Sequence, residues 1–246
     1  MIIDSHVHIG ITEKNTTYFD FSSFYKHMKN NGVDKSVVFP NISNIKKFSE
    51  LNKNFIEEFI NSEYKEFYYP FLLIDASDEI TLEQIKTEQI YGIKYHPSIS
   101  QRSIDDISLV PFFNQCRKKN IPILCHCGRN EISHIKYLCN AAKKNPDINF
   151  IGAHLGGNAT DIIEESLDIL KKEKINNIYL DTSAGKLPRL IEYAVEVLGE
   201  NKIIFGSDEP YADIRIQQQC VKLSKLPKRV KRYIFSDNII SLLFNE

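Results

Sequence analysis

Eight short apolar runs, rich in residues that favour β-strands, follow one another along the whole chain. They span residues 2–6, 35–40, 67–73, 92–96, 121–126, 149–154, 178–182 and 202–208. Their first residues lie 24 to 33 positions apart, close to the roughly 30 residues of one strand–helix unit. The segments between them carry apolar residues at helical spacing, and so does a final stretch, 216–244, broken at Pro227. The pattern predicts strict alternation of strand and helix.

Eight such units close most naturally into a (β/α)8 TIM barrel, an α/β fold whose chemistry lies at the C-terminal ends of the strands. The 246 residues fit one such domain, 1–246, because a barrel of this kind uses about 250 residues. An open doubly wound sheet is the alternative. No G-x-G-x-x-G follows the first run and no phosphate-binding loop is present, so nothing indicates a nucleotide cofactor.

Charge and composition exclude several classes of protein. The chain has 31 basic and 32 acidic residues, which removes the electrostatic argument for binding nucleic acid or an anionic membrane. No run approaches the roughly 20 apolar residues of a membrane span, and polar residues interrupt the N-terminus, so we expect a cytoplasmic protein. Five irregularly spaced cysteines do not describe a disulfide framework.

The histidines are the most informative residues. Five of the seven stand at the ends of predicted strands: His6, His8, His96, His126 and His154. Asp208 ends the eighth strand, whereas His27 and His134 fall in predicted helices. Two residues apart on one strand, His6 and His8 point to the same side. A lone histidine in an apolar run is usually a core residue, but histidines gathered at one end of a barrel indicate a site.

Imidazole and carboxylate ligands suit zinc, iron, manganese, cobalt or nickel. The sequence offers no thiolate set for a closed structural site. Three histidines and one aspartate would leave a coordination position for water, which is the arrangement of a catalytic metal. The strand ends therefore predict an open metal site.

Four motifs resemble the amidohydrolase superfamily. Asp4-Ser-His6-Val-His8 resembles its strand-one H-x-H motif, and Phe-Gly-Ser-Asp208 its strand-eight aspartate. The stretches around His126 and His154 resemble its strand-five and strand-six histidines. Details such as Lys94-Tyr-His96-Pro are similar to the amidohydrolase-related (amidohydrolase 2) branch, which includes aminocarboxymuconate-semialdehyde decarboxylase and pyrone-dicarboxylate lactonase.

The resemblance implies a ligand set. His6, His8, His126 and Asp208 would bind one divalent metal, with zinc as the first expectation and manganese, iron, cobalt or nickel as alternatives. His154 would lie beside it as an acid, a base or an electrophilic helper. Binuclear relatives carboxylate a strand-four lysine, so Lys94 with His126 and His154 could hold a second metal. The Lys-x-His-Pro form favours the single-metal site, with Lys94 as a cation beside the substrate.

The resemblance leaves the reaction open. The first expectation is hydrolysis of an amide or lactone bond in a small, carboxylated substrate, with Asp208 taking a proton from a metal-activated water. The alternative is metal-dependent non-oxidative decarboxylation of a small aromatic or enoic acid, and a minor alternative is an inactive metal-binding barrel. No residue type separates the two reactions.

Residues expected in the loops after the strands are candidates for holding a small-molecule substrate. We expect substrate contacts from His96, Arg129, Glu209 and Tyr211, and weaker candidates are Arg102, Asn130, Ser183 and Arg215. Eight units consume nearly the whole chain, which predicts short loops and an open mouth. A homodimer would help to close that mouth.

Overall fold

The structure, a computed structural model, describes residues 1–11, 18–42, 47–183, 185 and 187–244. Its centre is one sheet in the order β2-β1-β3-β4-β5-β6-β7-β8-β9. The strands are β1 Ile3–Ile11, β2 Tyr18–Phe19, β3 Lys35–Pro40, β4 Tyr68–Ile74, β5 Gly92–Tyr95, β6 Ile123–Cys125, β7 Phe150–Gly152, β8 Ile178–Asp181 and β9 Ile203–Ile204. All neighbours pair in parallel except β2, which adds a short antiparallel piece to β1. The (β/α)8 barrel is confirmed, and β2 is an element that the sequence did not predict.

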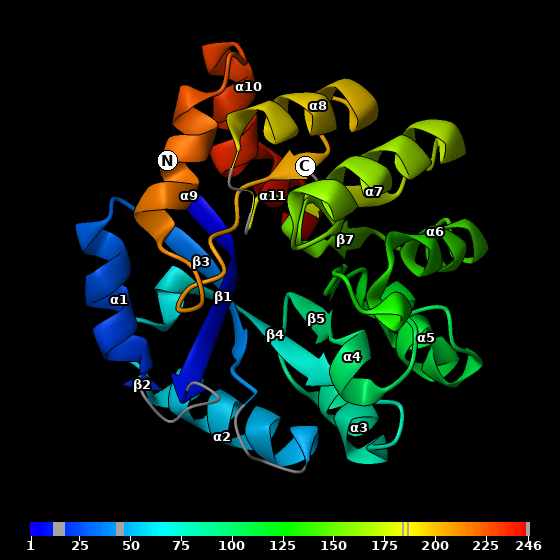
Figure 1. Ribbon diagram of the computed structural model, residues 1–246. Helices are drawn as coiled ribbons and strands as arrows, with labels where there is room; N and C mark the ends of the chain where they lie inside the picture. Colours follow the sequence, from blue (N-terminus) through cyan, green and yellow to red (C-terminus); the bar gives the residue numbers. More distant parts are fainter. Residues whose placement is uncertain (12–17, 43–46, 184, 186, 245–246) are drawn as a thin grey trace.

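Helices surround the strands (Figure 1). They are α1 Phe21–Asn30, α2 Phe48–Asn61, α3 Glu79–Thr87, α4 Pro97–Ser100, α5 Val110–Lys119, α6 Ile135–Lys144, α7 Thr160–Glu173, α8 Pro188–Leu198, α9 Ile214–Leu223, α10 Lys228–Arg232 and α11 Asn238–Phe244. A π-helical turn, Tyr233–Asp237, joins α10 to α11. None of the helices in the described part of the chain combines the length and apolarity of a membrane span.

The barrel closes between β1 and the segment that follows β9. The Ser5 amide donates to the Phe205 carbonyl at 2.8 Å, and the His8 amide donates to the Glu209 carbonyl at 2.9 Å. The residues after β9 therefore continue beside β1 although the regular strand stops at Ile204. This contact brings the end of the eighth barrel strand next to the histidines of the first.

Alternate strand residues form two separate cores. The barrel interior contains Ile3, Val37, Phe39, Tyr69, Phe71, Leu124, Ile151, Ala153 and Ile204, together with Ile239 and Leu242 of α11. Their neighbours along the strands, such as Val38, Leu72 and Ile93, pack outward against the helices. This alternation follows from the two-residue period of a strand. Because Ile239 and Leu242 belong to this inner core, the C-terminal helix contributes to filling the barrel.

The direction of the β1 side chains depends on an irregularity within the strand. Ile3 lies in the inner core, whereas Val7 and Ile9 belong to the outer core. The pairing with β3 shifts register between Asp4 and Val7, which exchanges the two faces of the strand. As a result, the apolar residues after the shift pack outward, and His6 and His8 share the inner face, as their spacing predicts.

Candidate metal centre

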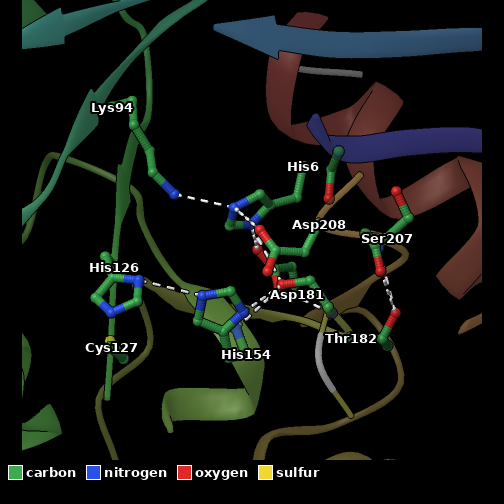
Figure 2. Close-up of polar contacts among 12 residues, drawn as sticks. His6, Lys94, His126, Cys127, His154, Asp181, Thr182, Ser207 and Asp208 are labelled. Atoms are coloured by element: carbon green, nitrogen blue, oxygen red, sulfur yellow. Dashed lines mark hydrogen bonds and ion pairs between the residues drawn. The ribbon is translucent and has the colours of Figure 1, made fainter. Parts of the chain in front are cut away.

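Three side chains from the two ends of the chain meet at the mouth of the barrel. His6 and His8 come from β1, and Asp208 follows β9. The Nε2 atoms of both histidines lie 3.2 Å from Oδ1 of Asp208. Asp208 has a left-handed backbone, with φ of 70°, and its amide donates to the His6 carbonyl at 2.9 Å. This local conformation turns the carboxylate toward the histidines (Figure 2).

The three side chains offer the donor set of a metal site. Their ligand atoms all lie within 4.8 Å of one another. Burial lowers the pKa of His8 to about 4, which keeps this imidazole neutral and able to donate a lone pair. Although burial raises the pKa of Asp208, His154, His6 and His8 together hold it well below its ordinary value. The neutral imidazole of His8 and the ionised carboxylate of Asp208 are the ligand forms that a divalent cation requires, and His6 would supply its lone pair in the neutral form, so these residues fit such an ion.

Asp181, at the end of β8, supports the first histidine. Its Oδ2 lies 2.7 Å from Nδ1 of His6, and both side chains are buried. Burial and the Lys94 ammonium lower the pKa of His6, but the carboxylates of Asp181 and Asp208 raise it overall. A carboxylate on the far nitrogen of a ligand imidazole is the usual support in metal sites. Sequence reasoning assigned Asp181 no role, although a carboxylate ending an apolar strand was the available signal.

Lys94 of β5 reaches the same cluster from the barrel interior. Its Nζ lies 3.1 Å from Nε2 of His6 and 4.6 Å from the centre of the Phe39 ring. The neighbouring strand residues Ile93 and Tyr95 point outward into the helix layer. Burial lowers the pKa of the Lys94 ammonium to about 8, so it remains largely protonated at neutral pH.

The strand-six histidine lies next to the cluster and contacts the strand-five histidine. Nε2 of His154 is 3.2 Å from Nδ1 of His126 (Figure 2). On its other side, Nδ1 of His154 is 2.8 Å from Oγ of Ser183. Burial lowers the pKa of His154 to about 4 and places that of His126 well below its ordinary value.

His126 stands apart from the three metal-ligand candidates. Among the described residues, the groups with ligand atoms close enough to share an ion are His6, His8 and Asp208, and His6, His154 and Asp181. His126 belongs to neither group. The assignment of His126 as a fourth ligand, and that of a second metal held by Lys94, His126 and His154, both stay predictions.

The remaining predicted substrate residues differ in their positions. His96, which follows β5, stacks on His126 with ring centres 4.0 Å apart, and its Nδ1 is buried without a partner. Tyr211 lies beside the site, because its ring meets that of His8 edge-on at 5.1 Å. Its hydroxyl donates to Oδ1 of Asn41 at 2.7 Å. These two residues line the mouth, and their contact with substrate stays a prediction.

Glu209 and Arg129 interact with other parts of the protein. The Glu209 carboxylate accepts from the Ile214 amide at 3.0 Å and lies 3.2 Å from Nε2 of His27, so it links the β9 end to α9 and α1. Arg129 is exposed and pairs with Asp161 at 3.0 Å. The structure therefore does not bring these two into the cluster. His134, expected inside a helix, instead caps the N-terminus of α6.

Asp4 is a second buried carboxylate that sequence reasoning passed over. Its Oδ1 accepts from the amides of His6 and Ser207, at 3.1 and 2.9 Å. Burial raises its pKa to about 7. By bonding to both amides, Asp4 joins the β1 end to the segment carrying Asp208. The available signal in the sequence was the position of Asp4, two residues before His6.

A parallel eight-stranded barrel with a His-x-His on its first strand and an aspartate after its last defines the class of metal-dependent barrel hydrolases and lyases. The sequence model of the family described as Amidohydrolase matches residues 3–244. The chain therefore belongs to this family of enzymes, which uses a divalent metal. No curated protein sequence matches the chain significantly.

Solved structures share the fold at low sequence identity. The 5-carboxyvanillate decarboxylase of Novosphingobium aromaticivorans, in complex with manganese and 4-hydroxy-3-methoxy-5-nitrobenzoic acid, has 11% identity and a TM-score of 0.79, covering 99% of this chain and 96% of that one. The 2,6-dihydroxybenzoate decarboxylase of Rhizobium has 13% identity and a TM-score of 0.75, covering 98% of both chains. The 4-oxalomesaconate hydratase of Rhodopseudomonas palustris has 16% identity and a TM-score of 0.71, covering 99% of this chain and 95% of that one.

Proposed function

We propose that the protein is a metal-dependent non-oxidative decarboxylase of a small aromatic or enoic carboxylic acid. The observation that carries this proposal is the buried Lys94 ammonium, 3.1 Å from Nε2 of His6. With a divalent ion held by His6, His8 and Asp208, the cation and Lys94 together outweigh the carboxylates of Asp181 and Asp208 by one positive charge. A buried site with surplus positive charge favours an anionic ligand, which a carboxylic acid supplies.

The choice of decarboxylation over hydrolysis draws on the related structures. Two of the three described above carry the names of decarboxylases, and one was solved with a nitrobenzoic acid. Decarboxylation is therefore preferred to the hydrolysis of an amide or lactone, which the sequence placed first. We further propose zinc or manganese as the metal, and a small carboxylated substrate as the only partner required.

The bound metal would supply a Lewis acid that orients the substrate and stabilises negative charge on its oxygens. Lys94 would pair with the substrate carboxylate. Asp208 is the carboxylate that substrate can reach, since its side chain is 17% exposed and that of Asp181 is fully buried. Because Asp208 is ionised in the free site, it would first take a proton from solvent and then deliver that proton to the carbon that bears the carboxyl group. The C–C bond then breaks, its electron pair returns to that carbon skeleton, and carbon dioxide leaves.

Hydrolysis remains a second candidate because of the protonation state of Asp208. Its low pKa makes it a carboxylate, which is the form that accepts a proton from water. His154 would then stabilise the developing oxyanion or protonate the leaving group. The 4-oxalomesaconate hydratase has a similar fold, and its name describes an addition of water.

The test is an assay of the protein loaded with zinc or manganese. Carbon dioxide release from hydroxybenzoic and enoic acids would be compared with hydrolysis of matched lactones and amides. We expect release of carbon dioxide that depends on metal and falls by at least about 100-fold in Asp208→Asn, as expected for loss of a proton-transfer group. Asp161→Asn, an exposed carboxylate change, serves as the control. Lactone or amide turnover without carbon dioxide release would replace the proposal with hydrolysis.

A further inference from the structure

Both carboxylate oxygens of Asp181 make polar contacts within the site. Its Oδ2 faces Nδ1 of His6, whereas its Oδ1 accepts from the amides of His154 and Ser183 at 2.9 and 3.0 Å. The Ser183 hydroxyl also donates to Oδ1. A carboxylate accepts only, so each group facing it must present a hydrogen. The hydrogens around this site can therefore be assigned from Asp181 outward.

The first assignment concerns His6. Because Oδ2 of Asp181 accepts, Nδ1 of His6 carries the hydrogen. A neutral His6 then keeps its lone pair on Nε2, the nitrogen that faces Asp208 and Lys94. That lone pair is the one that a metal ion shared with His8 and Asp208 requires.

The second assignment runs through Ser183. Its hydroxyl hydrogen is used on Asp181, so its oxygen accepts from Nδ1 of His154, 2.8 Å away. Nε2 of His154 then holds a lone pair and accepts from Nδ1 of His126 at 3.2 Å. The remaining lone pair of a neutral His126 is consequently on its Nε2 (Figure 2).

The backbone of His154 depends on the same carboxylate. His154 and Leu155 both have left-handed conformations, with φ of 59° and 54°. Such conformations are unfavourable for residues other than glycine and persist only where surrounding contacts hold them. The hydrogen bond from the His154 amide to Oδ1 of Asp181 is one such contact.

We propose that Asp181 is a positioning residue that fixes the tautomers of His6 directly and of His154 and His126 through Ser183, leaving Nε2 of His6 and His126 free to bind an ion. This inference rests on the proposed metal centre, but the tautomers are a property of the metal-free protein. It gives Asp181 a role that the sequence did not predict, and it gives Ser183, a weak candidate for substrate contact, a role in positioning the histidines. Neither residue needs to touch the substrate.

Two variants separate the branches of this network. In Asp181→Asn, the oxygen is expected at the Oδ1 position, where three donors converge, so the amide NH2 faces His6. Nδ1 of His6 must then accept, which moves its hydrogen to Nε2. In Ser183→Ala, the bridge to His154 is lost. The Ser183 hydroxyl also lies 3.2 Å from Nδ1 of His6, but the shorter contact of that nitrogen with Asp181, at 2.7 Å, remains and keeps its hydrogen there. Ser183→Thr retains the hydroxyl and is the conservative variant.

The experiment records side-chain nitrogen shifts of 15N-labelled histidines in the metal-free variants at alkaline pH, and zinc and manganese affinity by chelator competition. We expect hydrogen on Nδ1 of His6, His126 and His154 in the unmodified protein. In Asp181→Asn, the hydrogen should move from Nδ1 to Nε2 on His6 alone. Metal binding should weaken about 10- to 100-fold, as it does in other metal sites that lose a supporting partner. Ser183→Ala should change the tautomers of His154 and His126 alone, and Ser183→Thr should keep the tautomers of the unmodified protein.

A purely structural role would lower stability without moving these tautomers. An unchanged His6 tautomer and metal affinity within about twofold in Asp181→Asn would overturn the proposal. Unchanged tautomers of His154 and His126 in Ser183→Ala would also overturn the proposal. This second variant keeps the test decisive if Asp181→Asn does not fold. Asp161→Asn should match the unmodified protein throughout. Failure to release carbon dioxide would count against the proposed reaction and leave these results standing.

Discussion

The ammonium of Lys94 lies 3.1 Å from Nε2 of His6, inside the barrel and with only 1% of the lysine exposed. A cation this close to the ligand atom of a histidine needs a neighbouring anion, and Asp181 and Asp208 are the carboxylates that raise its pKa against burial. The same cation can pair with the carboxylate of a substrate. The position of Lys94 therefore connects the metal centre to substrate choice.

Lys94→Met tests this connection. A hydrogen bond to a charged group contributes about 1.5–3 kcal/mol, so affinity for a carboxylate inhibitor such as benzoate should fall roughly 10- to 100-fold. The free energy of unfolding should also fall, because methionine removes the buried cation that faces the carboxylates of Asp181 and Asp208. Titration of the metal-loaded protein measures the affinity, and exposed Lys136→Met is the matched control. Loss of one of two bound metals in Lys94→Met would instead identify Lys94 as a bridging ligand.

Gly92→Ala tests how β5 packs in the barrel. A Cβ at Gly92 would lie 2.4 Å from the Phe71 ring, closer than real contacts allow. Overpacking of this kind costs about 1–3 kcal/mol, which urea denaturation would detect as a lower free energy of unfolding. Phe71→Leu in the same chain should recover part of that loss by removing the ring. A double variant no more stable than Gly92→Ala would show that the ring is not the source.

Asp213 provides a prediction for pH. It caps α9 by accepting from the Arg215 amide at 2.8 Å, and hydrogen bonds from Arg215 lower its pKa to about 2 from 3.8. Asp213→Ala should lower stability by about 1 kcal/mol at neutral pH, as loss of an N-cap does. Because the folded-state pKa is the lower one, the part of this contribution that depends on the Asp213 charge is complete above pH 3.8 and disappears as pH falls through about 2.

Chemical denaturation across this range measures the difference between Asp213→Ala and the unmodified protein. Asp213→Asn, which keeps a capping oxygen, should retain most of the stability at neutral pH. A difference that is as large at pH 2 as at neutral pH would contradict a contribution from the Asp213 charge, and a large loss of stability in Asp213→Asn would contradict the capping role of its oxygen. Arg215, a weak candidate for substrate contact, is held by this same carboxylate.

The barrel could be predicted from the sequence because each strand is a short apolar run with a clear boundary. For example, β3 occupies the predicted residues 35–40. The run 202–208 gave a regular strand of two residues, Ile203–Ile204, and the rest of the run is joined to β1 by separate backbone hydrogen bonds. β2 has two residues, Tyr18–Phe19, and is too short to form an apolar run of its own.

The metal-ligand candidates could be predicted because they lie at strand ends. The hydrogen-bond partners of these histidines were harder to predict because they come from distant segments. The faces of His6 and His8 follow from their spacing, and both meet Asp208. The contact between His126 and His154 depends on ring orientation, which a strand period does not determine. Asp181 lies at the end of a predicted strand and Glu209 follows one, but the structure shows that Asp181 faces His6 whereas Glu209 links helices.

The central claim is that His6, His8 and Asp208 hold one divalent metal. Elemental analysis of the purified protein, before and after loading with zinc or manganese, tests it most directly. The account predicts one metal per chain, and a loss of affinity greater than about 100-fold in His8→Ala, beyond the loss caused by a supporting residue. His134→Ser, which keeps the cap of α6, should bind metal normally. No bound metal, or equal binding by His8→Ala, would contradict the account.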